Sequence, residues 1–209
     1  MRFSNQQIDA LRERVRGILS DFRFSHVLGV ERMAVIMAGL YCPEKESLLR
    51  AAALLHDVTK EKSLEEQLEI FKENSFKPTE EQLAVVPTIH ALTAPLVIPE
   101  EFPEFAEREL LDAIRYHSTG RADMTLSEKI IYLSDYIEDT RKFEDCIALR
   151  QEFFKAEPEK MSMDERYLHL NRVLLHAIDI TVTELEEKGR IIDKDTLLAK
   201  ESLLRELEI

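Results

Sequence analysis

The apolar positions along the chain recur at spacings of three and four residues, which is the period of an amphipathic α-helix. Ile8, Leu11, Val15 and Leu19 form one such stripe and predict a helix over about residues 5–19. Further helices are expected near 24–40, 43–57, 63 onward, 103–118, 125–137, 162–188 and 193–208. No segment shows the sustained period-two alternation of a half-buried strand. The pattern therefore predicts an all-α protein.

Helix boundaries are marked by residues that satisfy free backbone groups or interrupt the helical backbone. Gly189 is expected to end the longest helix, and the Asp193 side chain can cap the last one. At three expected helix starts, a Ser or Thr followed three positions later by Glu predicts a capping box: Ser63 with Glu66, Thr125 with Glu128, and Ser162 with Glu165. The middle of the chain should contain short helices and loops, because it carries five prolines: Pro78, Pro87, Pro95, Pro99 and Pro103.

Length and charge narrow the class of protein. A chain of 209 residues is long enough for one domain with a proper core. Its formal net charge of -13 leaves no basic surface for a nucleic acid, and a small anionic substrate would need a local cluster of cations or metal. No run approaches the roughly 18 apolar residues of a membrane span. Cys42 and Cys146 form no C-x-x-C pair and are expected to be free thiols. Because residues 1–10 are also too polar for a signal peptide, we expect a cytoplasmic protein.

The first candidate functional residues directly follow a helix that the sequence predicts to be buried. Residues 51–55 read Ala-Ala-Ala-Leu-Leu and are followed directly by His56 and Asp57. Small and apolar residues on all sides indicate a helix inside the core. Burial of an ionised carboxylate is costly unless it is paired or bound to a metal. The alternative is a polar patch where the helix meets solvent, and an adjacent His-Asp pair alone does not decide between the two.

Four further residues strengthen the metal interpretation. His26 lies near the start of its helix, His90 in the proline-broken middle, and His117 at the end of an amphipathic helix. Asp135 interrupts an apolar helix, where Asp is a poor residue. Each of them alone could be an ordinary hydrogen-bonded polar residue. The order His, His-Asp, His, His, Asp is much harder to obtain by chance. His169 and His176 lie about 10 Å apart along one helix, too far for one ion, and are expected to be structural.

The order and local sequence of these segments resemble those of the HD-domain phosphohydrolase superfamily, and within it those of the YqeK-type symmetrical diadenosine tetraphosphate hydrolases of bacteria. The resemblance covers roughly residues 20–188 and rests on these segments: Phe24-Ser25-His26, Leu54-Leu55-His56-Asp57, His90, His117-Ser118-Thr119-Gly120, and Glu128 to Glu138 running on to Arg141. The chain departs from the sequence pattern of the family at Asp139-Thr140, where a Pro is expected. The resemblance implies an HD-domain helical bundle at 20–188, preceded by an N-terminal helix at 1–19 and followed by a C-terminal helix at 189–209 packed on it.

The resemblance also implies two divalent metal ions. His26, His56, Asp57 and Asp135 would hold one ion, and His90 and His117 the second, with Asp57 bridging as the catalytic carboxylate. Six protein groups are too many for one ion that keeps an open position and suit two ions that share a carboxylate. Such a pair generates a bound hydroxide and clamps phosphoryl oxygens. Mixed imidazole and carboxylate donors favour iron, manganese or zinc over calcium, and the family association favours iron.

The cations that the acidic background requires are found beside these ligands. Lys60 follows Asp57 by about one turn, Arg23 precedes His26 by three residues, and two more cations flank Asp135. A hydroxyl and a flexible backbone near His117 suit phosphate oxygens. The substrate contacts expected from spacing and resemblance are Lys60, Thr119, Gly120, Lys129, Arg141 and Arg23.

The leading hypothesis for function is hydrolysis of diadenosine tetraphosphate into two ADP by metal-bound hydroxide. A second hypothesis keeps the metal site but gives it another nucleotide, as in a phosphohydrolase or a cyclic-nucleotide phosphodiesterase. A third, from another class, is a nucleotide-sensing module without turnover, and the full set of ligands argues against it. The expected partner is a dinucleoside polyphosphate, with neither nucleic acid nor membrane. Spare apolar surface on amphipathic helices also allows a homodimer.

Overall fold

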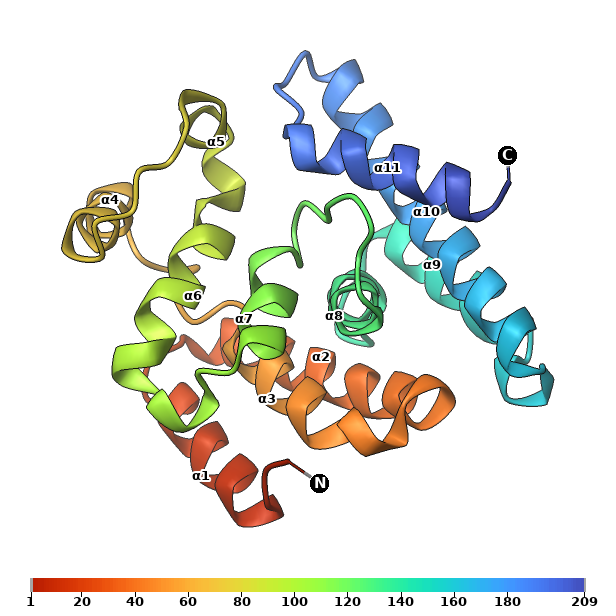
Figure 1. The fold of residues 1–209 in the computed structure, drawn as a ribbon, viewed down its shortest axis with the longest axis horizontal. Helices are drawn as coiled ribbons and strands as arrows, with labels where there is room; N and C mark the ends of the chain where they lie inside the picture. The colour runs from red at the N-terminus through yellow and green to blue at the C-terminus, as the bar shows by residue number, and fades with distance from the viewer. Residues whose placement is uncertain (1, 209) are drawn as a thin grey trace.

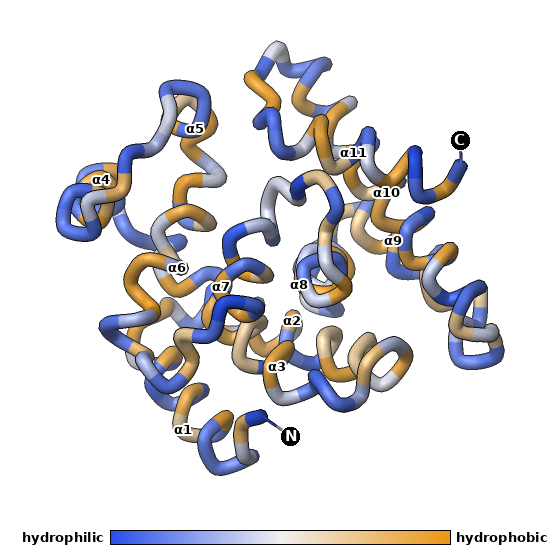
Figure 2. The backbone as a smooth tube through the Cα atoms, viewed as in Figure 1, coloured by the Kyte–Doolittle hydropathy of each residue, from blue (hydrophilic) through white to orange (hydrophobic). Residues whose placement is uncertain are grey.

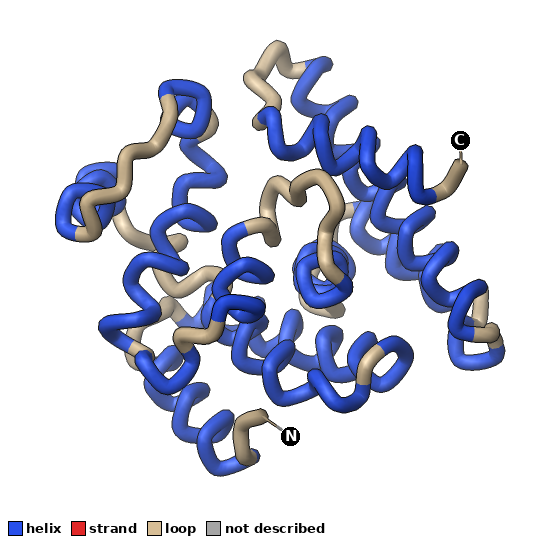
Figure 3. Tube along the Cα trace, in the orientation of Figure 1, coloured by secondary structure: helices blue, strands red, loops and turns tan. Residues whose placement is uncertain are grey.

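The computed structural model describes residues 2–208, which form eleven α-helices and four short 3-10 helices and contain no strand (Figures 1 and 3). The α-helices are α1 (Asn5–Arg16), α2 (Asp21–Tyr41), α3 (Glu46–Leu55), α4 (Leu64–Glu73), α5 (Glu80–Ala84), α6 (Ile89–Glu101), α7 (Arg108–Arg115), α8 (Leu126–Ile137), α9 (Glu144–Lys155), α10 (Met163–Glu187) and α11 (Lys194–Glu206). The 3-10 helices are η1 (Pro43–Lys45), η2 (Val86–Thr88), η3 (Pro103–Phe105) and η4 (Pro158–Lys160). The prediction of an all-α protein is confirmed.

Helix α3 is the centre of the bundle. It contacts α1, α2, α7 and α8, and its Ala51, Ala52 and Ala53 have no exposed surface. Alanine side chains are small, so neighbouring helices can approach on every side of α3. The residues that follow α3 are consequently delivered to the middle of the protein.

The C-terminal helices pack on this bundle, as predicted. Helix α10 contacts α2, α8, α9 and α11, and one hydrophobic core extends from Phe3 to Leu203. Figure 1 shows α8 end-on near the centre, with α9, α10 and α11 on one side and α4, α5 and α6 on the other. Apolar and polar segments alternate along the tube of Figure 2, as amphipathic helices require.

The predicted capping boxes are present at the starts of α4, α8 and α10, and the Asp193 side chain caps α11. Helix α9 was not predicted, because it buries only Cys146, Leu149 and Phe153 and has a weak apolar stripe. Both cysteines are free and buried. Within the described part of the chain, no helix is sufficiently long and apolar to cross a membrane.

The proline-rich middle differs from expectation. Helix α6 runs through Pro95 and Pro99 without interruption, although each proline removes one backbone donor. Burial of Ile89, Ala94 and Ile98, all without exposed surface, offsets this loss through packing. His90 therefore lies in the first turn of a helix that Pro95 and Pro99 do not break, contrary to expectation, whereas α5, η2 and η3 are the short helices expected in this region.

Candidate metal centre

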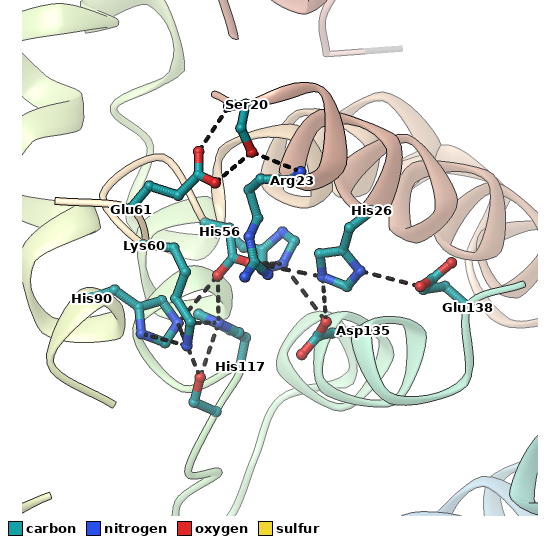
Figure 4. A network of polar contacts seen from close by, with 12 residues as sticks. Ser20, Arg23, His26, His56, Lys60, Glu61, His90, His117, Asp135 and Glu138 are labelled. Carbon is teal, nitrogen blue, oxygen red and sulfur yellow. Dashed lines mark hydrogen bonds and ion pairs between the residues drawn. The ribbon is translucent and has the colours of Figure 1, made fainter. Parts of the chain in front are cut away.

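Six side chains from five parts of the bundle converge on one buried point (Figure 4). Helix α2 contributes one of them, the end of α3 two, and α6, the end of α7 and α8 one each. In chain order they are His26, His56, Asp57, His90, His117 and Asp135. Their ligand atoms form three groups, in each of which all atoms lie within 4.8 Å of one another: His26-His56-Asp57, His56-His117-Asp135 and Asp57-His90-His117. The structure brings together all six residues that the sequence singled out.

Three of the four imidazoles are held by hydrogen bonds through Nδ1. His56 Nδ1 donates to the carbonyl oxygen of Ala53 (2.7 Å) and His117 Nδ1 to that of Ile114 (2.6 Å). His26 Nδ1 lies 3.1 Å from Glu138 Oε1 and donates to it. An imidazole that donates through one nitrogen is a ready ligand through the other.

The opposite nitrogens have the surroundings expected of metal ligands. His26 Nε2 and His56 Nε2 are buried and have no hydrogen-bond partner among the described residues. His26 Nε2 does lie 2.9 Å from Asp135 Oδ1, but outside hydrogen-bond geometry. Buried polar atoms are nearly always satisfied, so two orphaned nitrogens that face carboxylates fit a bound cation.

Asp57 lies between two sets of histidines. Its Oδ2 is 3.6 Å from His56 Nε2 and 3.8 Å from His26 Nε2. Its Oδ1 is 3.2 Å from His90 Nε2 and 3.8 Å from His117 Nε2. We call His26, His56 and Asp135 the His26 side, and His90 and His117 the His90 side. One carboxylate thus presents one oxygen to each side.

The protonation of these groups follows from their neighbours. Burial disfavours the charged form of His26, but the adjacent carboxylates of Asp135 and Glu138 outweigh it and raise its pKa to about 9. On the His90 side, burial lowers the pKa of both His90 and His117. Burial also acts to raise the pKa of Asp57, but the adjacent imidazoles reverse this effect and hold it well below its usual value. The centre therefore combines ionised Asp57 with an imidazole at His26 that favours its protonated form and imidazoles at His90 and His117 that favour their neutral form.

Glu138, at the end of α8, was missed by the sequence analysis. Its side chain has no exposed surface, and it also accepts hydrogen bonds from the backbone N–H (2.5 Å) and hydroxyl (2.6 Å) of Thr140. Gly29 makes room for the carboxylate, since a Cβ there would lie 2.1 Å from Glu138 Oε2.

Comparison with known proteins agrees with this geometry. The family model described as HD domain matches residues 23–140, more than half of the chain and the segment that holds all six side chains. The chain belongs to the HD domain family. HD domains bind divalent metals, and the His and Asp groups of this one are able to hold a metal.

Similar proteins cover nearly the whole chain. A protein of Halalkalibacterium halodurans, named symmetrical bis(5'-nucleosyl)-tetraphosphatase, is 30% identical over 92% of this chain and 94% of its own length. A Bacillus subtilis protein of the same name is 31% identical over 88% of this chain and 90% of its own. A crystal structure from Clostridium acetobutylicum, described as a predicted HD superfamily hydrolase involved in NAD metabolism, has a TM-score of 0.80. It is 30% identical and covers 95% of this chain and 97% of that one. The predicted fold and family are confirmed.

Three of the predicted substrate cations lie beside the HD-domain centre. Arg23 Nη1 is 2.7 Å from Asp57 Oδ2, and Arg141 Nη2 is 2.6 Å from Asp135 Oδ1. Lys60 Nζ lies 3.2 Å from His90 Nδ1, and burial lowers its pKa. Positive charge is therefore available on both sides of Asp57 in an acidic protein.

The other three predicted contacts have structural partners. Lys129 Nζ donates to Asn171 (3.0 Å) and pairs with Glu206, which ties α8 to α10 and α11. Thr119 is buried and donates to the carbonyl oxygen of Gly120 (2.9 Å). Gly120 has φ +66° and packs so closely on α11 that a Cβ would lie 2.9 Å from Ala199 Cβ.

Besides His117 itself, Ser118 is the residue of the His117 to Gly120 segment that reaches the centre. Its Oγ lies 3.0 Å from His117 Nε2 and 3.3 Å from His90 Nε2. His169 and His176 lie apart from the centre, the first against Phe153 and the second beside Glu152.

Proposed function

We propose that this HD-domain hydrolase cleaves diadenosine tetraphosphate symmetrically and releases two molecules of ADP. The observation that carries the proposal is the position of Asp57, whose two oxygens face different histidines within one buried cluster. The names of the relatives from Halalkalibacterium halodurans and Bacillus subtilis supply the substrate class.

In this proposal, His26, His56 and Asp135 hold one divalent ion, His90 and His117 hold a second, and Asp57 is shared. When bound, such ions activate water and neutralise charge on phosphoryl oxygens. The mixture of imidazole and carboxylate donors suits iron first, with manganese or zinc as alternatives.

The chain's own cations position the tetraphosphate. The guanidinium groups of Arg23 and Arg141 are fixed by Asp57 and Asp135 at the edge of the centre, with donors left for phosphate oxygens. Lys60 supplies a third positive charge beside His90. These groups stabilise the charge that develops on the phosphate chain, and ADP leaves without needing a proton donor.

The test is incubation of the purified chain with diadenosine tetraphosphate and iron(II) or manganese(II), followed by separation of the products by ion exchange. We expect ADP as the only product, lost on addition of a chelator and in Asp57→Ala, and retained in the control Asp9→Asn on the exposed surface of α1.

Two other results would contradict the proposal. ATP plus AMP would show a different point of attack by the same class of enzyme. Failure to hydrolyse diadenosine tetraphosphate with any metal would exclude this substrate. A screen of other nucleotides would then separate a different phosphohydrolase from a sensing module that only binds.

A further inference from the structure

A cleft of about 440 Å³ opens beside the His26 side of the centre. Its walls come from the first turns of α2 and from the segment between α8 and α9. His26 and Glu138 lie at its inner end, where Figure 4 shows them side by side. A ligand bound in this cleft would therefore extend outward from the metal centre.

Two phenylalanines line the same cleft and are largely exposed. Phe22 is 78% exposed and Phe143 69% exposed. The chain has ten phenylalanines, and the other eight, all within the described residues, are buried or half-buried. Exposed aromatic rings lose the contribution to stability that burial would give. Their placement on one cleft points to a role in binding.

The polarity of the cleft changes from its mouth to its inner end. The two rings are apolar and exposed, whereas Arg23 and Arg141 are bound to Asp57 and Asp135 of the metal centre. Lys142 adds a further exposed cation to the wall. A ligand matched to this gradient carries anionic groups at one end and a flat aromatic group at the other, as a nucleotide does.

We propose that this cleft is a nucleoside subsite in which Phe22 and Phe143 contact the base by stacking, while Arg23 and Arg141 hold the adjoining phosphates. The inference rests on the proposed function, because a dinucleoside tetraphosphate cut at its centre must extend a nucleoside away from the metals. Stacking accepts any base, since every base has a π-face. The subsite therefore selects for a nucleoside and discriminates little between adenine and guanine.

The experiment compares the wild type with Phe22→Ala, Phe143→Ala, the double variant and Phe143→Tyr, each as the full chain loaded with manganese(II). Calorimetric titration with ADP and with inorganic pyrophosphate separates the contribution of the base from that of the phosphates. We expect each alanine to weaken ADP binding on the order of tenfold, with pyrophosphate binding unchanged and ADP binding retained in Phe143→Tyr. Tyr167→Ala, at an exposed aromatic position on α10, is the matched control.

Hydrolysis kinetics distinguish this inference from the proposed function. A rise in KM for diadenosine tetraphosphate with little change in kcat supports the subsite, and so does a similar KM for the guanosine analogue. Equal losses for ADP and pyrophosphate, or unchanged ADP binding, would overturn it. A wild type that binds ADP through these rings but does not hydrolyse the tetraphosphate would retain the subsite and reject the proposed function. Sedimentation of the double variant tests the remaining alternative, since conversion of a dimer to monomer with unchanged ADP affinity would assign the rings to a homodimer contact.

Discussion

The two sides of Asp57 use the same type of ligand in different electrostatic surroundings. On the His26 side, His26 contacts the carboxylates of Asp135 and Glu138, and its pKa is raised to about 9. On the His90 side, the Nε2 atoms of His90 and His117 lie 3.0 Å apart, and burial lowers the pKa of both. The His26 side thus contains the one imidazole of the centre whose pKa is raised, whereas burial lowers the pKa of both imidazoles of the His90 side.

This difference shows that the position of its neighbouring carboxylates decides whether the pKa of a buried histidine is raised or lowered. The directly adjacent carboxylates of Asp135 and Glu138 outweigh the desolvation of His26. His56, on the same side, lies farther from its carboxylates, at 3.6 Å from Asp57 and 3.8 Å from Asp135, and burial lowers its pKa. We infer that the two metal positions are inequivalent and that Asp57 is the group common to both. Substitutions on each side of Asp57 test that inequivalence.

Asp57→Asn removes the shared carboxylate and should affect both sides together. We expect loss of hydrolysis by more than about 100-fold, beyond the loss typical of residues that only support a ligand. Activity with diadenosine tetraphosphate is the measurement, and circular dichroism checks that the variant folds. Retention of more than a tenth of the wild-type rate would contradict a shared role for this residue.

Glu138→Gln should weaken the His26 side alone. The amide keeps the shape of the side chain but removes the charge that supports His26 as a ligand, so metal affinity should fall about 10- to 100-fold. Equilibrium dialysis against manganese(II) measures this loss, with the exposed Glu144→Gln as control. An unchanged affinity for manganese(II) would show that Glu138 contributes to packing and not to metal binding.

Gly29→Ala tests the same carboxylate from the opposite helix. The added methyl group would displace Glu138 and should lower the free energy of unfolding by about 1–3 kcal/mol. Gly39→Ala, on the same helix with no atom within 4 Å of its Cβ, should be neutral or slightly stabilising. Thermal unfolding of the two variants provides the comparison. Equal melting temperatures would show that the Glu138 side chain moves aside at no cost.

Ser118→Ala is the counterpart on the His90 side and should have the smallest effect. Its hydroxyl contributes one hydrogen bond near His90 and His117, worth about 1 kcal/mol, so kcat/KM should fall only about fivefold. An effect larger than that of Glu138→Gln would reverse the comparison between the two sides.

The sequence could predict the fold class and the six converging side chains because both are recorded locally. Helical periodicity, a capping box and a histidine-bearing segment can each be recognised from residues that lie close together in the sequence. The contact between Glu138 and His26 spans 112 residues and needs the close approach at Gly29, which no local pattern reveals. Lys129 illustrates the same limit, since its spacing from Asp135 suggested a substrate contact whereas tertiary packing pairs it with Glu206.

Helix α6 could not be predicted for a related reason. Pro95 and Pro99 weaken a helix locally, and only the burial of neighbouring apolar residues in the assembled core compensates for them. The exposed rings of Phe22 and Phe143 likewise have no periodic signature, since their significance lies in the cleft that they share.

The most direct test of the account is the metal content of the purified chain and of its one-sided variants after saturation with manganese(II) and desalting. We expect about two equivalents in the wild type, about one in His117→Ala and about one in His26→Ala, because each variant keeps the ligands of the other side together with Asp57. A single equivalent in the wild type, or two in either variant, would contradict the assignment of Asp57 as a carboxylate shared between two metal positions.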